Sequence, residues 1–420
     1  MSSPSGPSRL RLIPILIAQG FGVACGIAGV KLNSHLLPPE TLGIYGVFLT
    51  LAPLGMWVVH AGVIKSVGRH WAASPSRPDL LRQAVALWLR RLPWLALLAV
   101  PAAAALARMS SPAILAIWLS VFPAAALLVV GALAQSALQA ERAHWRDCAV
   151  SVSGSATRTF APLACFVFGG GTLASLWTGF GLHALVFAAA GALTLRSYWA
   201  VAPEGRRPTP MSSTYRGPLF ILLATAGWIL SGLNRWLVAG FFGETEAGYF
   251  TLAGGAALVI SATLGSVFVQ FFQPGFFALG DHATGHAPLA RRVDRVALGY
   301  GVVALSAIGA FALASPLLVG GLIGERYRDA LPWILPAGCF GVALLTTGFY
   351  QSLLMAGRCE KACGPVELAT AAVLAIGCVG SAALGKTWFA QWLIITPLVP
   401  WVLMRPMARH YLFREARRGR

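Results

Sequence analysis

Long apolar runs separated by short polar segments cover almost the whole chain. Read with a window of about 19 residues, this pattern predicts a series of membrane spans. Twelve spans are expected, near residues 12–34, 42–64, 84–107, 112–135, 148–169, 172–195, 218–240, 249–273, 295–318, 330–355, 364–385 and 387–408. Backbone groups in hydrocarbon find no water to bond, so spans of this length must be helices. The sequence therefore predicts an all-α polytopic membrane protein with about twelve transmembrane helices.

Two phrases of the sequence occur twice. "QSALQAER" (135–142) returns as "QSLLMAGR" (351–358), and "PPETLGIYGVFLTLA" (38–52) resembles "GETEAGYFTLAGGAA" (243–257). The offsets are 216 residues (351 minus 135) and 205 residues (248 minus 43). Both pairs fall at corresponding places six spans apart, so the two copies have the same membrane orientation. The pattern predicts two parallel six-helix bundles around a central cavity, an arrangement in which transporters hold substrate between the halves.

The repeat also predicts the domain boundaries. Residues 1–195 form an N-terminal six-helix bundle and residues 218–420 a C-terminal one. Between them, residues 196–217 are rich in Pro, Gly, Ser and Arg, which favours a cytoplasmic linker.

Composition supports the membrane assignment and charge adds a direction. The chain is 57% hydrophobic and 11% charged, against roughly 25% charged residues in soluble proteins. Its net charge of +18 gathers in alternate loops, mainly 65–91, 196–216 and 405–420. This is the positive-inside pattern, and it places both termini in the cytoplasm. Because no basic domain stands clear of the bilayer, we expect membrane lipids and no nucleic acid as partners.

Polar side chains inside the predicted spans are the candidate substrate-binding residues, because such groups usually face a cavity. The candidates are Arg158, Arg235, His60, His183, Asn33, Asn234, Gln135 and Gln351. Carboxylates are nearly absent at depth, which favours an anionic cargo, since a guanidinium fork binds phosphate oxygens in pairs. The alternative is that each arginine ties helices together through backbone carbonyls. No spacing of His, Cys, Asp or Glu indicates a metal site or a catalytic set, so we expect a protein that is not an enzyme.

Three segments resemble the Wzx-type polysaccharide biosynthesis flippases. They are "LGIYGVFLTLAPLGMWVVHAGV" (42–63), "LNRWLVAGFFGETEAGYF" (233–250) and "IGERYRDALPWILPAGCF" (323–340). The resemblance implies the fold of the multidrug/oligosaccharidyl-lipid/polysaccharide exporter superfamily. It also implies a bacterial inner-membrane flippase that moves an undecaprenyl-pyrophosphate-linked oligosaccharide, a unit of O-antigen, capsule or exopolysaccharide, to the outer leaflet. Asn234 stands where that family often has Asp, so no carboxylate-based ion coupling is carried over.

Two other functions remain open from the sequence. One is a drug or cation exporter of the same fold, which the scarcity of deep acids disfavours. The other is a polytopic glycan polymerase or ligase, which would need a sizeable outer loop. We expect no cofactor. Coupling to a proton or ion gradient, or to the membrane potential, stays open, as does a partnership with the polymerase of the same glycan pathway.

Overall fold

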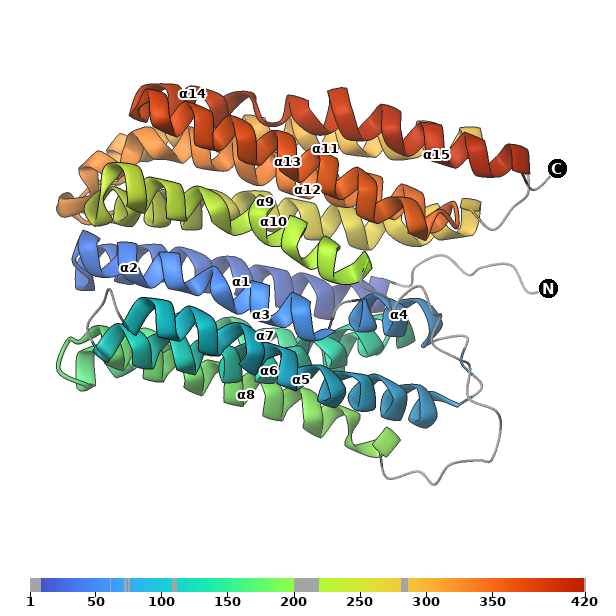
Figure 1. The fold of residues 1–420 in the computed structure, drawn as a ribbon, viewed down its shortest axis with the longest axis horizontal. Coiled ribbons are helices and arrows are strands. Elements are labelled where there is room, and N and C mark those ends of the chain that lie inside the picture. The colour runs from blue at the N-terminus through green and yellow to red at the C-terminus, as the bar shows by residue number, and fades with distance from the viewer. Residues whose placement is uncertain are drawn as a thin grey trace. The chain divides into compact units, whose positions relative to one another are not determined.

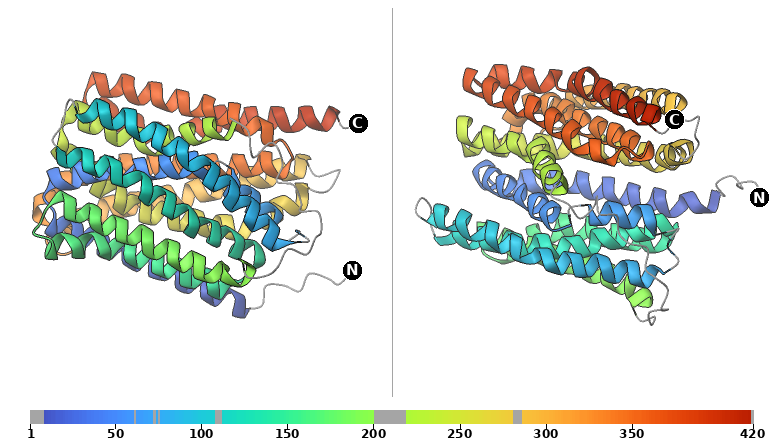
Figure 2. Two further views of the ribbon diagram at one scale, coloured as in Figure 1. Left: turned by 60° about the horizontal axis from the view of Figure 1, so that its bottom comes forward. Right: turned by 45° about the vertical axis from the view of Figure 1, so that its right-hand side comes forward.

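The structure is a computed structural model that describes residues 9–60, 62–71, 74, 76–107, 112–199, 219–280 and 286–418. Its regular elements in those residues are helices, apart from an isolated bridge between Val319 and Ile323 (Figures 1 and 2). The first eight are α1 (Arg9–Leu36), α2 (Pro39–Leu49), α3 (Leu51–His60), α4 (Val63–His70), α5 (Arg77–Ala107), α6 (Pro112–Glu141), α7 (His144–Phe168) and α8 (Leu173–Trp199). The others are α9 (Leu219–Phe242), α10 (Glu244–Gly280), α11 (His286–Ala314), η2 (Ser315–Leu318), η3 (Glu325–Trp333), α12 (Ile334–Ala356), α13 (Glu360–Leu384), α14 (Lys386–Ile395), η4 (Pro400–Met404) and α15 (Arg405–Arg418).

Many of these helices are long and apolar enough to cross a bilayer. Seven pass by length and composition among the residues described, or eight if the pair Lys386–Ile395 and Pro400–Arg414, bent by 45°, is one span. The chain is a multi-pass membrane protein, and the predicted all-α class is confirmed. Each predicted span has a helical counterpart, while the number of twelve crossings stays a prediction.

The chain divides into two compact units. Unit 1 comprises Met1–Gly29 and Leu51–Ile221, and unit 2 comprises Val30–Thr50 and Leu222–Arg420. In unit 1, α7 and α6 each pack along α8, and in unit 2, α12 packs along α10 and α11 (Figure 1). The division therefore assigns the end of α1 and all of α2 to the second unit, unlike the sequence-based boundary at residue 195. Residues 196–199 of the predicted linker form the last turn of α8, and its residues 200–217 lie outside the described part of the chain.

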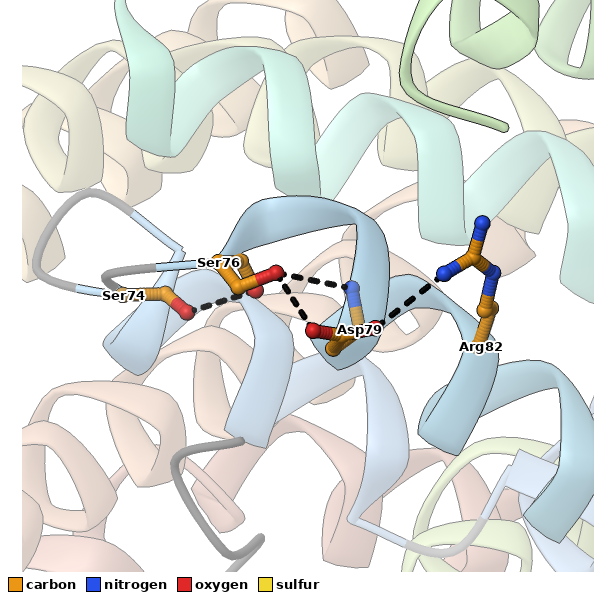
Figure 3. Close-up of polar contacts among 4 residues, drawn as sticks. All are labelled: Ser74, Ser76, Asp79 and Arg82. Atoms are coloured by element: carbon orange, nitrogen blue, oxygen red, sulfur yellow. Dashed lines mark hydrogen bonds and ion pairs between the residues drawn. The ribbon is translucent and has the colours of Figure 1, made fainter. Parts of the chain in front are cut away.

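The start of α5 shows how local sequence sets a helix end. Ser76 precedes the helix, and its hydroxyl donates to the Asp79 carboxylate (2.7 Å) and accepts from the Asp79 backbone N–H (3.4 Å). The other carboxylate oxygen accepts from Arg82, one turn later (3.1 Å), while Ser74 donates to the Ser76 carbonyl (Figure 3). The serine before the helix thus satisfies a backbone N–H that has no partner within the helix, and the acid at the third residue accepts from the serine hydroxyl.

The second predicted span is not a continuous helix. It is divided into α2, α3 and α4, with breaks at Thr50 and at Gly62, whose φ is +84°. The first break follows from Pro53, which has no N–H and whose ring collides with the carbonyl four residues earlier, that of Leu49. Leu49 is the last residue of α2, and the boundary between the two units falls directly after Thr50. A division inside a span that hydropathy alone shows as one run thus coincides with a proline one turn later.

The repeated phrase of the sequence has the same backbone geometry in both copies. Arg142 and Arg358, each the last residue of its phrase, are the described non-glycine residues with positive φ, at 61° and 58°. The N–H of Arg142 bonds the carbonyl three residues back, and the next N–H bonds the carbonyl five residues back. Arg358 and its successor repeat both bonds. This is a Schellman helix end, in which the left-handed position is usually glycine.

We predict that Arg142→Gly unfolds at a higher temperature than Arg142→Ala. Both variants lose the charge, but alanine keeps the left-handed backbone strain of about 1–2 kcal/mol that glycine relieves. Thermal unfolding of the purified variants measures the difference, and the same comparison at Arg358 is its internal replicate. Equal midpoints for the glycine and alanine variants at both positions would contradict the assignment.

The other repeated phrase brings its two copies together inside unit 2. A Cβ atom on Gly43 of α2 would lie 2.0 Å from the Glu244 carbonyl oxygen, and one on Gly248 of α10 would lie 1.9 Å from the Pro39 carbonyl oxygen. Both pairs of equivalent residues, 43 with 248 and 39 with 244, are separated by 205 positions. A local two-fold axis therefore relates the two helices where they cross, so that Gly43 and Gly248 make equivalent contacts.

Candidate functional site

The broken end of α2 is completed by side chains of α9, including the predicted site residue Arg235. A helix leaves its last four carbonyls without helical partners. Arg235 donates from Nη1 to the Gly46 carbonyl (3.2 Å), and Trp236 donates from Nε1 to the Thr50 hydroxyl (2.8 Å). That hydroxyl in turn donates to the Val47 carbonyl (2.6 Å). Arg235 is half-buried and touches backbone, as the helix-tying alternative expects.

The two predicted asparagines of unit 2 differ in burial. Asn234 is buried, and its side-chain oxygen accepts from the backbone N–H of Arg235 (2.8 Å). Asn33 is half-buried near the end of α1. Because Asn234 carries a neutral amide, the turn of α9 that holds Arg235 has no negative charge beside the guanidinium group.

The motif at 323–340 supports the end of α1. Tyr327 donates its buried hydroxyl to the Leu37 carbonyl (3.1 Å), and the Gly324 N–H donates to the Ser34 hydroxyl (3.0 Å). The turn that contains Gly324 and Tyr327 therefore satisfies polar groups at a helix C-terminus. From the sequence, the segment 323–340 carried only the family resemblance, and its contacts with the end of α1 were not predicted.

In unit 1, His183 and Arg158 lie close together on neighbouring helices. His183 of α8 is buried, with its Nδ1 2.9 Å from the Thr157 hydroxyl of α7 and its ring beside Phe180 and Phe187. Arg158 is the next residue after Thr157, and it is exposed on α7. The histidine has the contacts of a helix-packing residue, whereas the arginine presents its charge at the surface of the unit.

The remaining predicted residues are dispersed. Gln135 of α6 donates to the Ser151 hydroxyl of α7 (2.9 Å), which joins these two helices. His60, at the end of α3, is buried with its ring 5.8 Å from that of Trp57. Gln351 is half-buried in α12. Among the predicted residues, the fold brings His183 of α8 to the turn of α7 that carries Arg158, through the contact with Thr157.

A buried charged cluster of unit 2 was missed by sequence analysis. Asp294 of α11 is buried and accepts hydrogen bonds from Tyr350 of α12 (3.2 Å) and from Arg405 of α15 (3.1 Å). Arg409, one turn further along α15, also pairs with Asp294. In sequence, Asp294 stands beside a basic loop and outside the predicted spans, so nothing local indicated burial.

Metal ligands do not gather in the part of the chain that the structure describes. It contains no group of three or more His, Cys, Asp or Glu side chains placed to hold an ion.

Comparison with protein families assigns the chain to one of them. Residues 34–332 match the family described as "Polysaccharide biosynthesis protein", which is well over half of the sequence. The chain belongs to this family. The match contains the first two segments that carried the resemblance to polysaccharide biosynthesis flippases, and residues 323–332 of the third. No curated protein matches the sequence.

Solved structures show the same fold at low sequence identity. The lipid II flippase MurJ, in an inward closed conformation, superposes with a TM-score of 0.62 at 10% identity, covering 98% of this chain and 88% of that one. An outward-facing multidrug resistance MATE family transporter of the MOP superfamily gives 0.59 at 15% identity, covering 98% and 96%. A MOP superfamily transporter from Pyrococcus furiosus gives 0.57 at 15%, covering 98% and 94%. This member of the polysaccharide biosynthesis family therefore has the fold seen in MOP superfamily transporters.

Proposed function

We propose that the protein is a flippase that moves an undecaprenyl-pyrophosphate-linked oligosaccharide from the cytoplasmic to the outer leaflet by alternating access. Its membership in the polysaccharide biosynthesis family is the observation that carries the proposal. The fold alone does not choose a cargo, because a lipid II flippase and multidrug transporters share it. The membrane in this proposal is the bacterial plasma membrane, with both termini on the cytoplasmic side and the pathway's polymerase as a candidate partner.

The charge of the polar residues supports an anionic cargo. Arg235 is half-buried on α9 and Arg158 is exposed on α7. Of the two buried acids of unit 2 among the residues described, Asp294 is already neutralised by Arg405 and Arg409, and Glu367 lies two turns into α13. A desolvated cation needs a carboxylate to offset its charge, whereas a pyrophosphate needs guanidinium groups. The Pyrococcus furiosus relative is described as having a binding pocket of reverse polarity that suggests a different function, so pocket charge varies within this fold.

The membrane potential favours the proposed direction. An anion that leaves a negative interior gains about 2.3 kcal/mol per charge per 100 mV. A head group near −2 would gain roughly 4–5 kcal/mol by the same relation. Coupling to an ion gradient is therefore not required by the energetics.

Arg235→Ala is expected to slow translocation at least ten-fold. A hydrogen bond to a charged group contributes about 1.5–3 kcal/mol, and a loss of 1.4 kcal/mol is a factor of ten. The assay follows the appearance of a lipid-linked glycan in the outer leaflet of vesicles that contain the purified protein. Arg235→Lys keeps the charge but loses the planar fork of the guanidinium group. Its translocation rate should lie between those of the wild type and Arg235→Ala.

The matched control is Arg328→Ala, because Arg328 is an exposed arginine of the same unit that pairs with Glu325. It should transport at the wild-type rate. Thermal unfolding of each variant separates a lost substrate contact from the lost bond to Gly46. A folded Arg235→Ala that transports the glycan normally would refute the assigned role, and export of organic cations by the wild type without glycan flipping would refute the function.

A further inference from the structure

A basic groove lies in unit 1, where the first turn of α7 meets the last turns of α8. It has a volume of about 550 Å³. Its lining residues, which define the Arg146 groove, are Arg146, Leu193, Thr194, Arg196 and Ser197. The volume is within the usual range of small-molecule sites, about 300–1,000 Å³. None of these five residues was a candidate in the sequence analysis of the cargo site.

The donors of the Arg146 groove are suited to a phosphate. Arg146 and Arg196 are exposed, and neither makes an ion pair with any carboxylate among the residues described. The Ser197 hydroxyl is also exposed, whereas Thr194 already donates its proton to the Gly191 carbonyl (2.8 Å) and can only accept. Two guanidinium groups and one hydroxyl thus remain as donors to oxygens of an anion.

The neighbouring acids are occupied by other groups. Glu141 accepts from Arg77 (2.8 Å) and from the Tyr198 hydroxyl, so the negative charge of Glu141 is compensated by Arg77. Asp147 follows Arg146 at the start of α7, before the apolar span, and accepts from Gln139 (3.3 Å). Burial raises the pKa of the Asp147 carboxyl to about 6, which the bond from Gln139 opposes. With Glu141 paired to Arg77, the two arginines of the groove still outweigh the one charge of Asp147, so the groove has a net positive charge.

The apolar side of the groove points to a ligand with a hydrocarbon chain. Leu193, which lines it, is 68% exposed. Trp145, directly before Arg146, is 63% exposed, and Trp199, three residues after Arg196, is 51% exposed. Tryptophan is enriched where the hydrocarbon core meets the head groups, and α8 is one of the helices able to span. The groove thus lies at head-group level on a helix whose apolar surface continues into the bilayer.

We propose that the Arg146 groove binds the phosphate of a membrane lipid, with the lipid chain lying against Leu193. The shared chemistry is a phosphate ester attached to a long hydrocarbon, whose source is either a bilayer phospholipid or a prenyl pyrophosphate carrier. The site stands whether or not the protein flips a glycan, because its geometry involves unit 1 alone.

The test measures lipid binding by the purified full-length protein in a nonionic detergent. Short-chain phosphatidylglycerol, farnesyl pyrophosphate, diacylglycerol and inorganic phosphate are titrated separately, and thermal unfolding reports each dissociation constant through ligand stabilisation. We expect one or both phosphate lipids to bind and the other two probes to bind at least ten-fold more weakly. Tighter phosphatidylglycerol indicates a bilayer lipid, and tighter farnesyl pyrophosphate indicates the carrier.

The double variant Arg146→Ala/Arg196→Ala is expected to weaken phosphate-lipid binding at least ten-fold, since each charge-assisted bond contributes about 1.5–3 kcal/mol. Arg291→Ala/Arg295→Ala, which removes two exposed arginines of α11, is the matched control for lost net charge and should bind as the wild type. Arg146→Lys/Arg196→Lys should retain part of the affinity. Equal losses in both alanine pairs, equal binding of diacylglycerol, or inorganic phosphate as tight as the lipids would overturn the proposal.

Discussion

A single methyl group added at Gly248 is expected to force α10 away from α2 and to lower the thermal unfolding midpoint of the protein. The new Cβ atom would lie 1.9 Å from the Pro39 carbonyl oxygen, far inside van der Waals contact. The atom it meets belongs to a helix backbone and cannot turn aside, as the end of a flexible side chain could. Overpacking in a tight interface typically costs about 1–3 kcal/mol and occasionally more.

Gly255→Ala is the matched control for this variant. Gly255 is in the same helix, and a Cβ atom there would meet nothing within 4 Å. Alanine is the better helix former by about 1 kcal/mol, so this variant should be as stable as the wild type or more stable. The contrast between two Gly→Ala changes in α10 isolates the crossing from helix propensity.

Because the crossing of α2 and α10 is locally symmetric, the equivalent change at Gly43 should have the same effect. Gly43→Ala should destabilise the protein as Gly248→Ala does, because its Cβ atom would lie 2.0 Å from the Glu244 carbonyl oxygen. Once one methyl group has separated the helices, the other adds little, so the double variant should cost less than the two single costs together. Strict additivity, or a Gly248→Ala variant as stable as Gly255→Ala, would show that the two glycines do not share one interface.

The helices and the duplication could be predicted from the sequence because both depend on short-range patterns. Apolar runs of bilayer length must be helical. The two copies of the repeated phrase, which end in Arg142 and Arg358, have the same helix-end geometry. A proline such as Pro53 favours an interruption in a helix, so the break after Thr50 has a local signal in the sequence, but the assignment of residues 30–50 to the second unit has none. That assignment depends on contacts with residues about 200 positions away, such as the bond from Thr245 to Glu40.

The candidate site was less accessible to sequence reasoning. Hydropathy shows that a polar side chain is in a span, but it does not show what the side chain contacts. Arg235 reaches a carbonyl of α2 that is available because that helix ends nearby, and His183 is enclosed by aromatic rings. The Arg146 groove was missed because its arginines fit the positive-inside rule, which gave them a complete explanation at the level of the sequence.

Asp294→Ala is expected to release the C-terminal helix α15 from unit 2. Asp294 is buried and joins α11 to Arg405 and Arg409 of α15 and to Tyr350 of α12. Removing one partner of a fully buried ion pair costs about 3–5 kcal/mol, because the remaining charge stays buried. The two arginine side chains are 39% and 34% exposed, so solvent recovers part of this and we expect about 1–3 kcal/mol. Thermal unfolding and amide hydrogen exchange across residues 405–413 measure the effect.

The loss should be local, and that feature separates it from general destabilisation. Exchange should rise in α15 while α7 and α8, in the other unit, keep the wild-type rates. Arg405→Ala and Arg409→Ala should each cost less than Asp294→Ala, because the other arginine still neutralises the acid. Glu325→Ala, which breaks the exposed pair with Arg328, should cost about 0–1 kcal/mol. Unchanged exchange in α15 of a folded Asp294→Ala protein would show that packing alone holds this helix, and that the buried acid does not.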